Sequence, residues 1–90
     1  MEIQREVENW MRKKKATYWS PLAILARLTE EIGEVAREIN ISNGSKKLKK
    51  GEKRGDLEEE LGDVLFTLGV IANKMNLNLS KGFEKALKKR

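Results

Sequence analysis

Two short segments of the chain, 28–35 and 57–64, carry acidic residues in the same pattern. The first reads Leu-Thr-Glu-Glu-Ile-Gly-Glu-Val and the second Leu-Glu-Glu-Glu-Leu-Gly-Asp-Val, so five of the eight positions are identical. Each segment holds two acids three residues apart, which on a helix are neighbours with Cβ atoms about 5–6 Å apart. These pairs are Glu31 with Glu34 and Glu60 with Asp63. If the two helices pack antiparallel along their apolar stripes, we expect the four carboxylates to converge.

Four converging carboxylates repel one another, and this repulsion indicates a metal site. Two carboxylates about 4 Å apart cost about 1 kcal/mol in water and about 4 kcal/mol at an effective dielectric constant of 20. A divalent cation removes this cost, and a site built from carboxylate oxygens favours Mg²⁺ or Mn²⁺. Gly33 and Gly62 lie between the paired acids, where a missing side chain lets another group approach. A single Glu-x-x-Glu pair is usually a solvated helix face, but two pairs in matching register favour the metal site.

The overall composition excludes several kinds of catalytic and metal site. The chain has 90 residues, no histidine and no cysteine, and its 19 basic and 14 acidic residues give a formal charge of +5. This composition excludes thiolate nucleophiles, imidazole proton transfer and zinc sites built on Cys and His. The positive charge indicates an anionic partner. Most cations lie in three clusters, 12–15, 46–54 and 85–90, which flank an acidic middle of the chain.

The spacing of apolar residues is helical almost throughout and predicts four helices. They cover about 2–15, 21–40, 57–76 and a short stretch after Ser80. Ser20, Asp56 and Ser80 are the expected N-caps, because short polar side chains accept hydrogen bonds from the first free amides of a helix. The segment 42–55 is polar and predicts a loop, and no segment alternates long enough to form a strand. We therefore predict one all-α domain over residues 1–90, similar to a four-helix bundle.

The apolar stripes also bear on assembly and location. The two short predicted helices cannot bury the whole of the apolar stripes on the second and third predicted helices. We therefore expect a homodimer or a homotetramer, in which another copy of the chain buries the rest. The sequence has no apolar run of about 18 residues, and its charged N-terminus does not resemble a signal peptide. We therefore expect a cytoplasmic protein with no membrane partner.

The acidic motif as a whole resembles a known family. Glu30-Glu31-Ile32-Gly33-Glu34, then 25 residues, then Glu60-Leu61-Gly62-Asp63 is similar to the EExxE…ExxD signature of MazG-type nucleotide pyrophosphohydrolases. These enzymes belong to the all-α NTP pyrophosphatase superfamily. The resemblance implies hydrolysis of a nucleoside triphosphate to the monophosphate and pyrophosphate, including a house-cleaning role in removing non-standard nucleotides. It also implies that Mg²⁺, with Mn²⁺ as a substitute, is held by four acids: Glu31, Glu34, Glu60 and Asp63.

The resemblance implies roles for further residues. Glu30, the first acid of the motif, is a candidate for orienting or deprotonating the attacking water, and Glu31 is a catalytic residue as well as a ligand. Lys89 falls where family members often carry a lysine, although Arg90 follows it where an asparagine is usual. Lys74 lies on the acidic side of the third predicted helix. We expect Lys74 and Lys89 to be candidates for binding phosphate, with a solvated surface role as the alternative.

Aromatic residues near the first connection are candidates for binding the nucleobase. Trp10, Tyr18 and Trp19 cluster there, and an aromatic face accepts any base. Such residues more often anchor a core, but the family resemblance favours base contacts from this region. We therefore include Trp10 and Trp19 among the expected substrate-binding residues.

Two other functions remain open from the sequence. The first is phosphoribosyl-ATP pyrophosphohydrolase, whose family usually has Glu-Ala-x-Asp-Leu followed by a histidine, where this chain reads Glu60-Leu-Gly-Asp-Val-Leu-Phe66. The second is a non-enzymatic helical module that binds nucleic acid through the basic loop 46–54. That loop has no aromatic residues between its cations. We therefore rank nucleic acid below a nucleotide as the partner.

Overall fold

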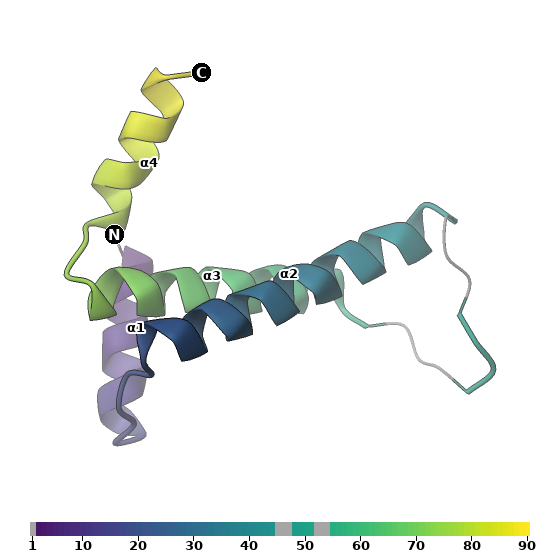
Figure 1. Cartoon of the computed structure of the whole chain (residues 1–90), viewed down its shortest axis with the longest axis horizontal. Coiled ribbons are helices and arrows are strands. Elements are labelled where there is room, and N and C mark those ends of the chain that lie inside the picture. Colours follow the sequence, from purple (N-terminus) through teal and green to yellow (C-terminus); the bar gives the residue numbers. More distant parts are fainter. Residues whose placement is uncertain (1, 45–47, 52–54) are drawn as a thin grey trace.

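The computed structural model describes residues 2–44, 48–51 and 55–90 and has four helices (Figure 1). They are α1 (Glu2–Lys13), α2 (Pro21–Ser42), α3 (Leu57–Lys74) and α4 (Leu79–Lys88). None of the described residues forms a strand, which confirms the all-α prediction. Most of the basic loop lies outside the described residues, so its predicted role stays a prediction. No helix in the described ranges is long and apolar enough to cross a membrane.

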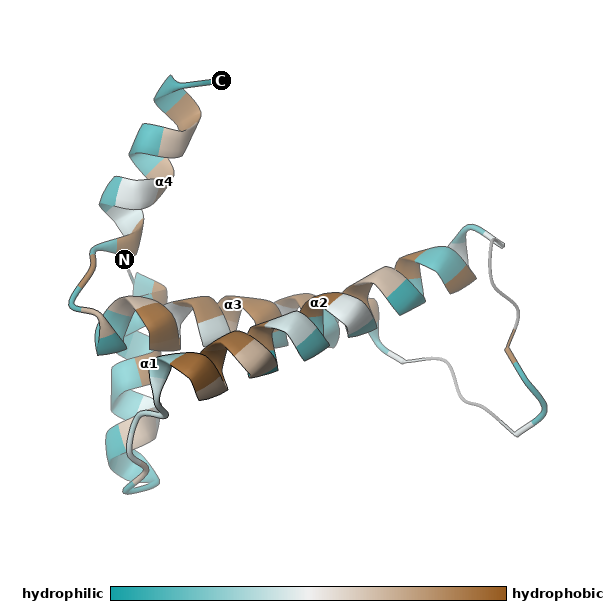
Figure 2. Cartoon of the chain, viewed as in Figure 1, coloured by the Kyte–Doolittle hydropathy of each residue, from teal (hydrophilic) through white to brown (hydrophobic). Residues whose placement is uncertain are grey.

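The helix α3 is central to the arrangement. It packs against α2 along an antiparallel hairpin and against α1, while α4 leads away from the other three helices (Figure 1). The core between them contains Val7 and Met11 of α1, Ile24 of α2 and Val70 of α3. The two helices run antiparallel and apolar residues occur along both of them (Figure 2), several of which, such as Leu25, Ile32 and Leu61, remain exposed. The hairpin therefore places the two acidic segments opposite each other.

The helix starts follow largely from their caps. The Ser20 hydroxyl accepts a hydrogen bond from the Ala23 amide at 3.2 Å, and the Asp56 carboxylate accepts from the amides of the first turn of α3. Both caps confirm the prediction. The expected cap Ser80 is wrong, because α4 begins two residues earlier. Asn78 caps it instead and accepts from the Lys81 amide at 3.1 Å.

Left-handed backbone explains why two helices are shorter than predicted. Lys15 has φ of +53° and Asn76 has φ of +56°, and neither conformation continues an α-helix. At these positions the amide of Ala16 donates a hydrogen bond to the Met11 carbonyl, and the amide of Leu77 donates one to the Ala72 carbonyl. The helix α1 therefore ends at Lys13, and α3 ends at Lys74.

A polar network connects α1 to the turn between α3 and α4. The amide of Gln4 donates to Asn73 Oδ1 at 3.0 Å and to the Leu77 carbonyl at 2.9 Å, and its oxygen accepts from the Leu79 amide at 2.8 Å. Asn73 in turn donates to the Tyr18 hydroxyl at 3.1 Å. These bonds fix α1 against α3 and thereby fix the position of Trp10, which α1 carries.

Candidate active site

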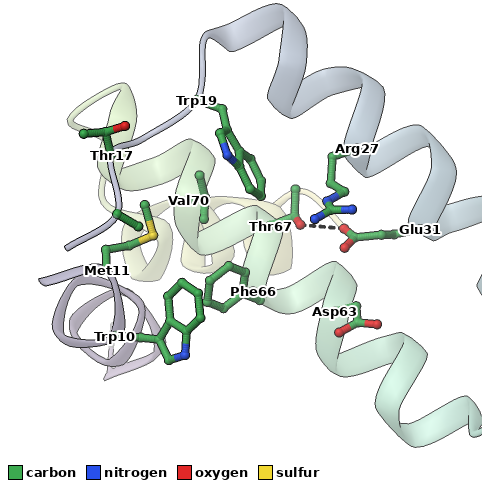
Figure 3. A pocket seen from close by; sticks show the side chains of 11 residues that line it. Trp10, Met11, Thr17, Trp19, Arg27, Glu31, Asp63, Phe66, Thr67 and Val70 are labelled. Carbon is green, nitrogen blue, oxygen red and sulfur yellow. Dashed lines mark hydrogen bonds between the residues drawn. The ribbon is translucent and has the colours of Figure 1, made fainter. Parts of the chain in front are cut away.

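The hairpin of α2 and α3 brings one acid of each predicted pair to the same cavity. Glu31 of α2 and Asp63 of α3 both line a pocket of about 400 Å³ (Figure 3). The Thr67 hydroxyl, one turn beyond Asp63 on α3, donates a hydrogen bond of 2.5 Å to Oε1 of Glu31. This bond holds one carboxylate oxygen of Glu31 and leaves the other available to a ligand.

The second acid of each pair lies farther along the hairpin, and the charges there are crowded. Glu60 is half-buried. Partial desolvation, followed by repulsion from Glu34 and from Asp63, raises the pKa of Glu60 above its ordinary value. The carboxylate of Glu38 adds to this repulsion. Negative charge from both helices therefore meets around Glu60.

The donor set fits a hard divalent cation. Within the described ranges, no three acidic side chains converge closely enough to hold a metal ion by themselves. Mg²⁺ does not require such a cage, because it keeps several waters and is usually bound by one or two carboxylates together with substrate phosphates. The crowded charge around Glu60 is the feature that a cation would relieve. The chemistry of these carboxylates thus fits a hard divalent cation such as Mg²⁺.

The walls of the same pocket are aromatic, and we call it the aromatic pocket. Trp10 of α1 and Phe66 of α3 pack edge to face, with ring centroids 5.3 Å apart and an interplanar angle of 84°. Trp19 lies across the pocket, with the guanidinium carbon of Arg27 5.1 Å from its ring centroid (Figure 3). Trp10 and Trp19 thus both line the cavity that Glu31 lines, and their role in substrate binding stays a prediction.

Other predicted residues lie apart from the aromatic pocket. Glu30 is exposed on α2 and does not line it. Lys74 is exposed at the end of α3, about 16 Å along the helix axis from Asp63. Lys89 follows α4, which leads away from the hairpin (Figure 1). Within one chain, the structure therefore does not bring either lysine to the acids.

The two glycines between the paired acids are not required by packing. A Cβ atom on Gly33 or Gly62 would meet no atom within 4 Å. Within the described part of the chain, nothing therefore makes use of the missing side chains. The space beside them remains open to a group from outside the chain.

The structure adds residues that the sequence did not single out. Arg27 and Thr67 contribute polar groups to the aromatic pocket, and Phe66 contributes a wall. Glu38 is buried one turn beyond Glu34 and lies near Glu60. The sequence could have indicated Arg27 and Glu38, because Arg27 lies four residues before Glu31 and Glu38 four after Glu34, on the same helix face. It could not have indicated Thr67, because the contact of Thr67 with Glu31 depends on the register between two helices.

A family model and two curated relatives match this chain. The family model of the MazG nucleotide pyrophosphohydrolase domain matches residues 19–90. The chain is 44% identical to YpjD of Bacillus subtilis (strain 168), over 98% of this chain and 79% of YpjD. It is 28% identical to YvdC of the same organism, over 94% of this chain and 92% of YvdC.

Two crystal structures share the fold. That of YpjD from Bacillus subtilis has a TM-score of 0.82 at 44% identity, covering 98% of this chain and 88% of the other. That of a Bacillus-conserved MazG protein, a nucleotide pyrophosphohydrolase, has a TM-score of 0.78 at 42% identity, covering 98% and 84%. The all-α fold and these matches define a hydrolase. The chain belongs to the MazG nucleotide pyrophosphohydrolase family.

Proposed function

We propose that this protein hydrolyses nucleoside triphosphates to the monophosphate and pyrophosphate, with Mg²⁺ held by Glu31, Glu34, Glu60 and Asp63. The observation that carries the proposal is that Glu31 and Asp63 line the same pocket as Trp10 and Trp19. A nucleotide has a base that stacks on aromatic rings and a phosphate chain that needs cations. Aromatic rings and carboxylates that could hold cations lie together in this pocket and along the hairpin, which supports the proposal.

The chemistry is the addition of water across the bond between the α- and β-phosphates. The water oxygen bonds to phosphorus, the bridging P–O bond breaks, and its electron pair leaves with pyrophosphate. Bound Mg²⁺ would lower the pKa of the water and neutralise charge on the leaving group. Thr67 holds Glu31 in a fixed orientation. Glu30, next to Glu31 in the chain, is the proposed group that orients the water or accepts its proton.

The base enters the aromatic pocket in this proposal. A cavity of about 400 Å³ lies within the size range of small-molecule sites. Arg27 stacks over Trp19 as a cation–π pair and supplies hydrogen-bond donors at the pocket wall. A house-cleaning role, in which the pocket accepts non-standard bases, belongs to the same proposal. We expect such an activity in the cytoplasm, where nucleoside triphosphates are made and consumed.

A panel of nucleoside triphosphates, assayed for pyrophosphate release with Mg²⁺, Mn²⁺ or EDTA, tests the proposal. We expect turnover that EDTA abolishes and that is lost in Glu31→Gln and Asp63→Asn, with unchanged helical circular dichroism. The matched control is Glu58→Gln, an exposed acid on α3, which should keep full activity. Full activity in either site variant, or no release from any nucleotide, would contradict the proposal.

We propose further that a second copy of the chain covers the apolar surface of the helices. Large apolar side chains remain more than half exposed on α2, α3 and α4, including Leu25, Ile32, Leu61 and Phe83. Exposed apolar surface on this scale is typical of an interface. Sedimentation equilibrium should give two or four times the 10.3 kDa chain mass. Ile32→Glu should shift the protein toward monomer, and the control Leu48→Glu, in the loop, should not. A compact, active monomer of the unchanged chain would contradict the assembly.

The two predicted phosphate-binding lysines are tested in the same assay. Lys74 and Lys89 are both exposed. If either binds the triphosphate, its alanine variant should raise KM for the nucleotide, because an ammonium close to phosphate stabilises the bound anion. The control is Lys81→Ala, an exposed lysine in the first turn of α4. Equal KM values in all three variants would contradict the assignment.

A further inference from the structure

A buried acid, Glu38, lies beside the proposed metal ligands and is not one of them. Glu38 of α2 is only 1% exposed, although it is a charged residue in a small protein. It follows Glu31 by seven residues and Glu34 by four, so the three acids form one row along the same face of α2. The row is about 10 Å long, from the aromatic pocket at Glu31 to Glu38.

The two carboxylate oxygens of Glu38 have different surroundings. Oε1 accepts a hydrogen bond of 2.7 Å from the Gly55 amide and one of 3.0 Å from the Arg37 guanidinium. Oε2 is buried and has no hydrogen-bond partner among the described residues. Buried carboxylate oxygens normally have a donor or a cation, because removal from water is costly. The structure thus fixes the carboxylate by one oxygen and leaves the other without a partner.

Gly55 shows how close Glu38 and Glu60 are. A Cβ atom built on Gly55 would lie 2.7 Å from Oε1 of Glu38 and 3.5 Å from Oε1 of Glu60. Both carboxylates therefore reach the same point of the backbone, just before α3 begins. Only glycine fits there without moving Glu38.

We propose that Glu38 is a fifth carboxylate of the metal centre, whose Oε2 shares a divalent cation with Glu60. This inference rests on the proposed function, since it extends the same centre. Glu38 lies at the end of the acid row opposite the aromatic pocket. If the base occupies that pocket, a cation held by Glu38 and Glu60 would lie on the side of the leaving pyrophosphate and would neutralise its charge. Glu38 would then act on the leaving group and not on the base.

Titration of the intact protein with Mn²⁺, followed by the electron paramagnetic resonance of free Mn²⁺, tests this without turnover. Glu38→Gln keeps the size of the side chain and an oxygen that accepts from Gly55, but it removes the charge. We expect it to lose one bound equivalent of Mn²⁺ or to weaken that site about 10- to 100-fold. Glu58→Gln should match the unchanged protein. Equal stoichiometry and affinity in Glu38→Gln and the unchanged protein would overturn the proposal.

A second measurement separates cation binding from a structural role. If Glu38 and Glu60 share a cation, Glu38→Gln and Glu60→Gln should affect Mn²⁺ affinity non-additively. Additive effects would overturn the shared site. If Glu38→Gln does not fold, Gly55→Ala takes its place, because its Cβ displaces the Glu38 carboxylate while keeping the charge. Unchanged Mn²⁺ binding in Gly55→Ala would then overturn the proposal.

The outcomes also distinguish this inference from the proposed function. If the unchanged protein binds no Mn²⁺ and releases no pyrophosphate, the proposed function fails. If it binds Mn²⁺ and hydrolyses nucleotides, and only Asp63→Asn weakens binding, the proposed function stands and the role of Glu38 is wrong. A loss of metal-free thermal stability in Glu38→Gln without any change in Mn²⁺ binding would assign Glu38 to the fold alone.

Discussion

The hydroxyl of Thr67 on α3 donates a hydrogen bond of 2.5 Å to Oε1 of Glu31 on α2. Thr67 is only 1% exposed, so no water replaces this bond readily. The contact joins Glu31, in the first segment of the sequence repeat, to α3 one turn beyond Asp63, and both residues line the aromatic pocket. It also fixes the rotamer of the proposed ligand, as hydrogen bonds to metal ligands commonly do.

Removal of this hydroxyl should weaken the metal centre. Thr67→Val keeps the shape of the side chain but leaves Oε1 of Glu31 without its donor. We expect Mg²⁺ affinity and kcat/KM to fall about 10- to 100-fold, with stability lower by about 1–3 kcal/mol. Thr67→Ser retains a hydroxyl and should recover most of the activity. A Thr67→Val enzyme with unchanged Mg²⁺ dependence would show that the bond does not position Glu31.

Loss of an aromatic wall should weaken nucleotide binding. Trp19→Leu removes a ring that a base can stack on, and stacking is worth about 1–3 kcal/mol per base. The expected result is a rise in KM of about 5- to 150-fold, with a smaller change in kcat. Trp19→Phe keeps an aromatic face and should lie between the two proteins. Steady-state kinetics with one good nucleotide substrate would contradict base stacking if KM stayed constant in Trp19→Leu.

The features that the sequence predicted well are local ones. The apolar period gives the helices, and Ser20 and Asp56 cap α2 and α3 as expected. The prediction that Ser80 caps α4 is wrong because Asn78, two residues before it, is an equally good cap. The left-handed turn at Asn76 decides between them, because it ends α3 early and lets α4 start at Leu79.

The contacts between helices could not be predicted from the sequence. The repeat predicted that the acids of α2 and α3 face each other, but not that Thr67 would hold Glu31, 36 residues away. Nor did it show that Glu38 would be buried against Gly55. Such contacts depend on the register and separation of packed helices, which single-chain periodicity does not determine. The structure therefore adds the side chains and backbone groups that contact the predicted acids.

The close contact of α1 and α3 gives a prediction on stability. A Cβ atom on Gly69 would lie 2.8 Å from Cγ2 of Val7, which is buried. Gly69→Ala should therefore force α1 away from α3 at a cost of about 1–3 kcal/mol, or several degrees in Tm. The control is Gly33→Ala, whose Cβ meets open space and which should gain up to about 1 kcal/mol of helix propensity. Thermal unfolding by circular dichroism would contradict this packing if both variants were stabilised.

The crowded charge around Glu60 gives a prediction on pH and metal. The pKa of Glu60 is raised above its ordinary value of 4.5, by partial desolvation and by repulsion from Glu34, Asp63, Glu38 and Glu59. A raised pKa means that the folded state binds this proton more tightly than the unfolded chain. The stability contributed by protonated Glu60 is therefore present below pH 4.5 and is lost as the pH rises through the raised pKa.

The direction of this pH dependence of stability distinguishes the unchanged protein from Glu60→Gln in the absence of metal. The glutamine variant cannot ionise, so its Tm should equal that of the unchanged protein at low pH and exceed it at pH 7. Mg²⁺ should reverse the order at pH 7, because it stabilises the ionised carboxylates and binds the variant less well. Thermal unfolding at several pH values, with EDTA or Mg²⁺, measures both effects. Glu58→Gln should follow the unchanged protein throughout, and a Glu60→Gln protein that is less stable than it at pH 7 in EDTA would contradict the crowding of charge at this site.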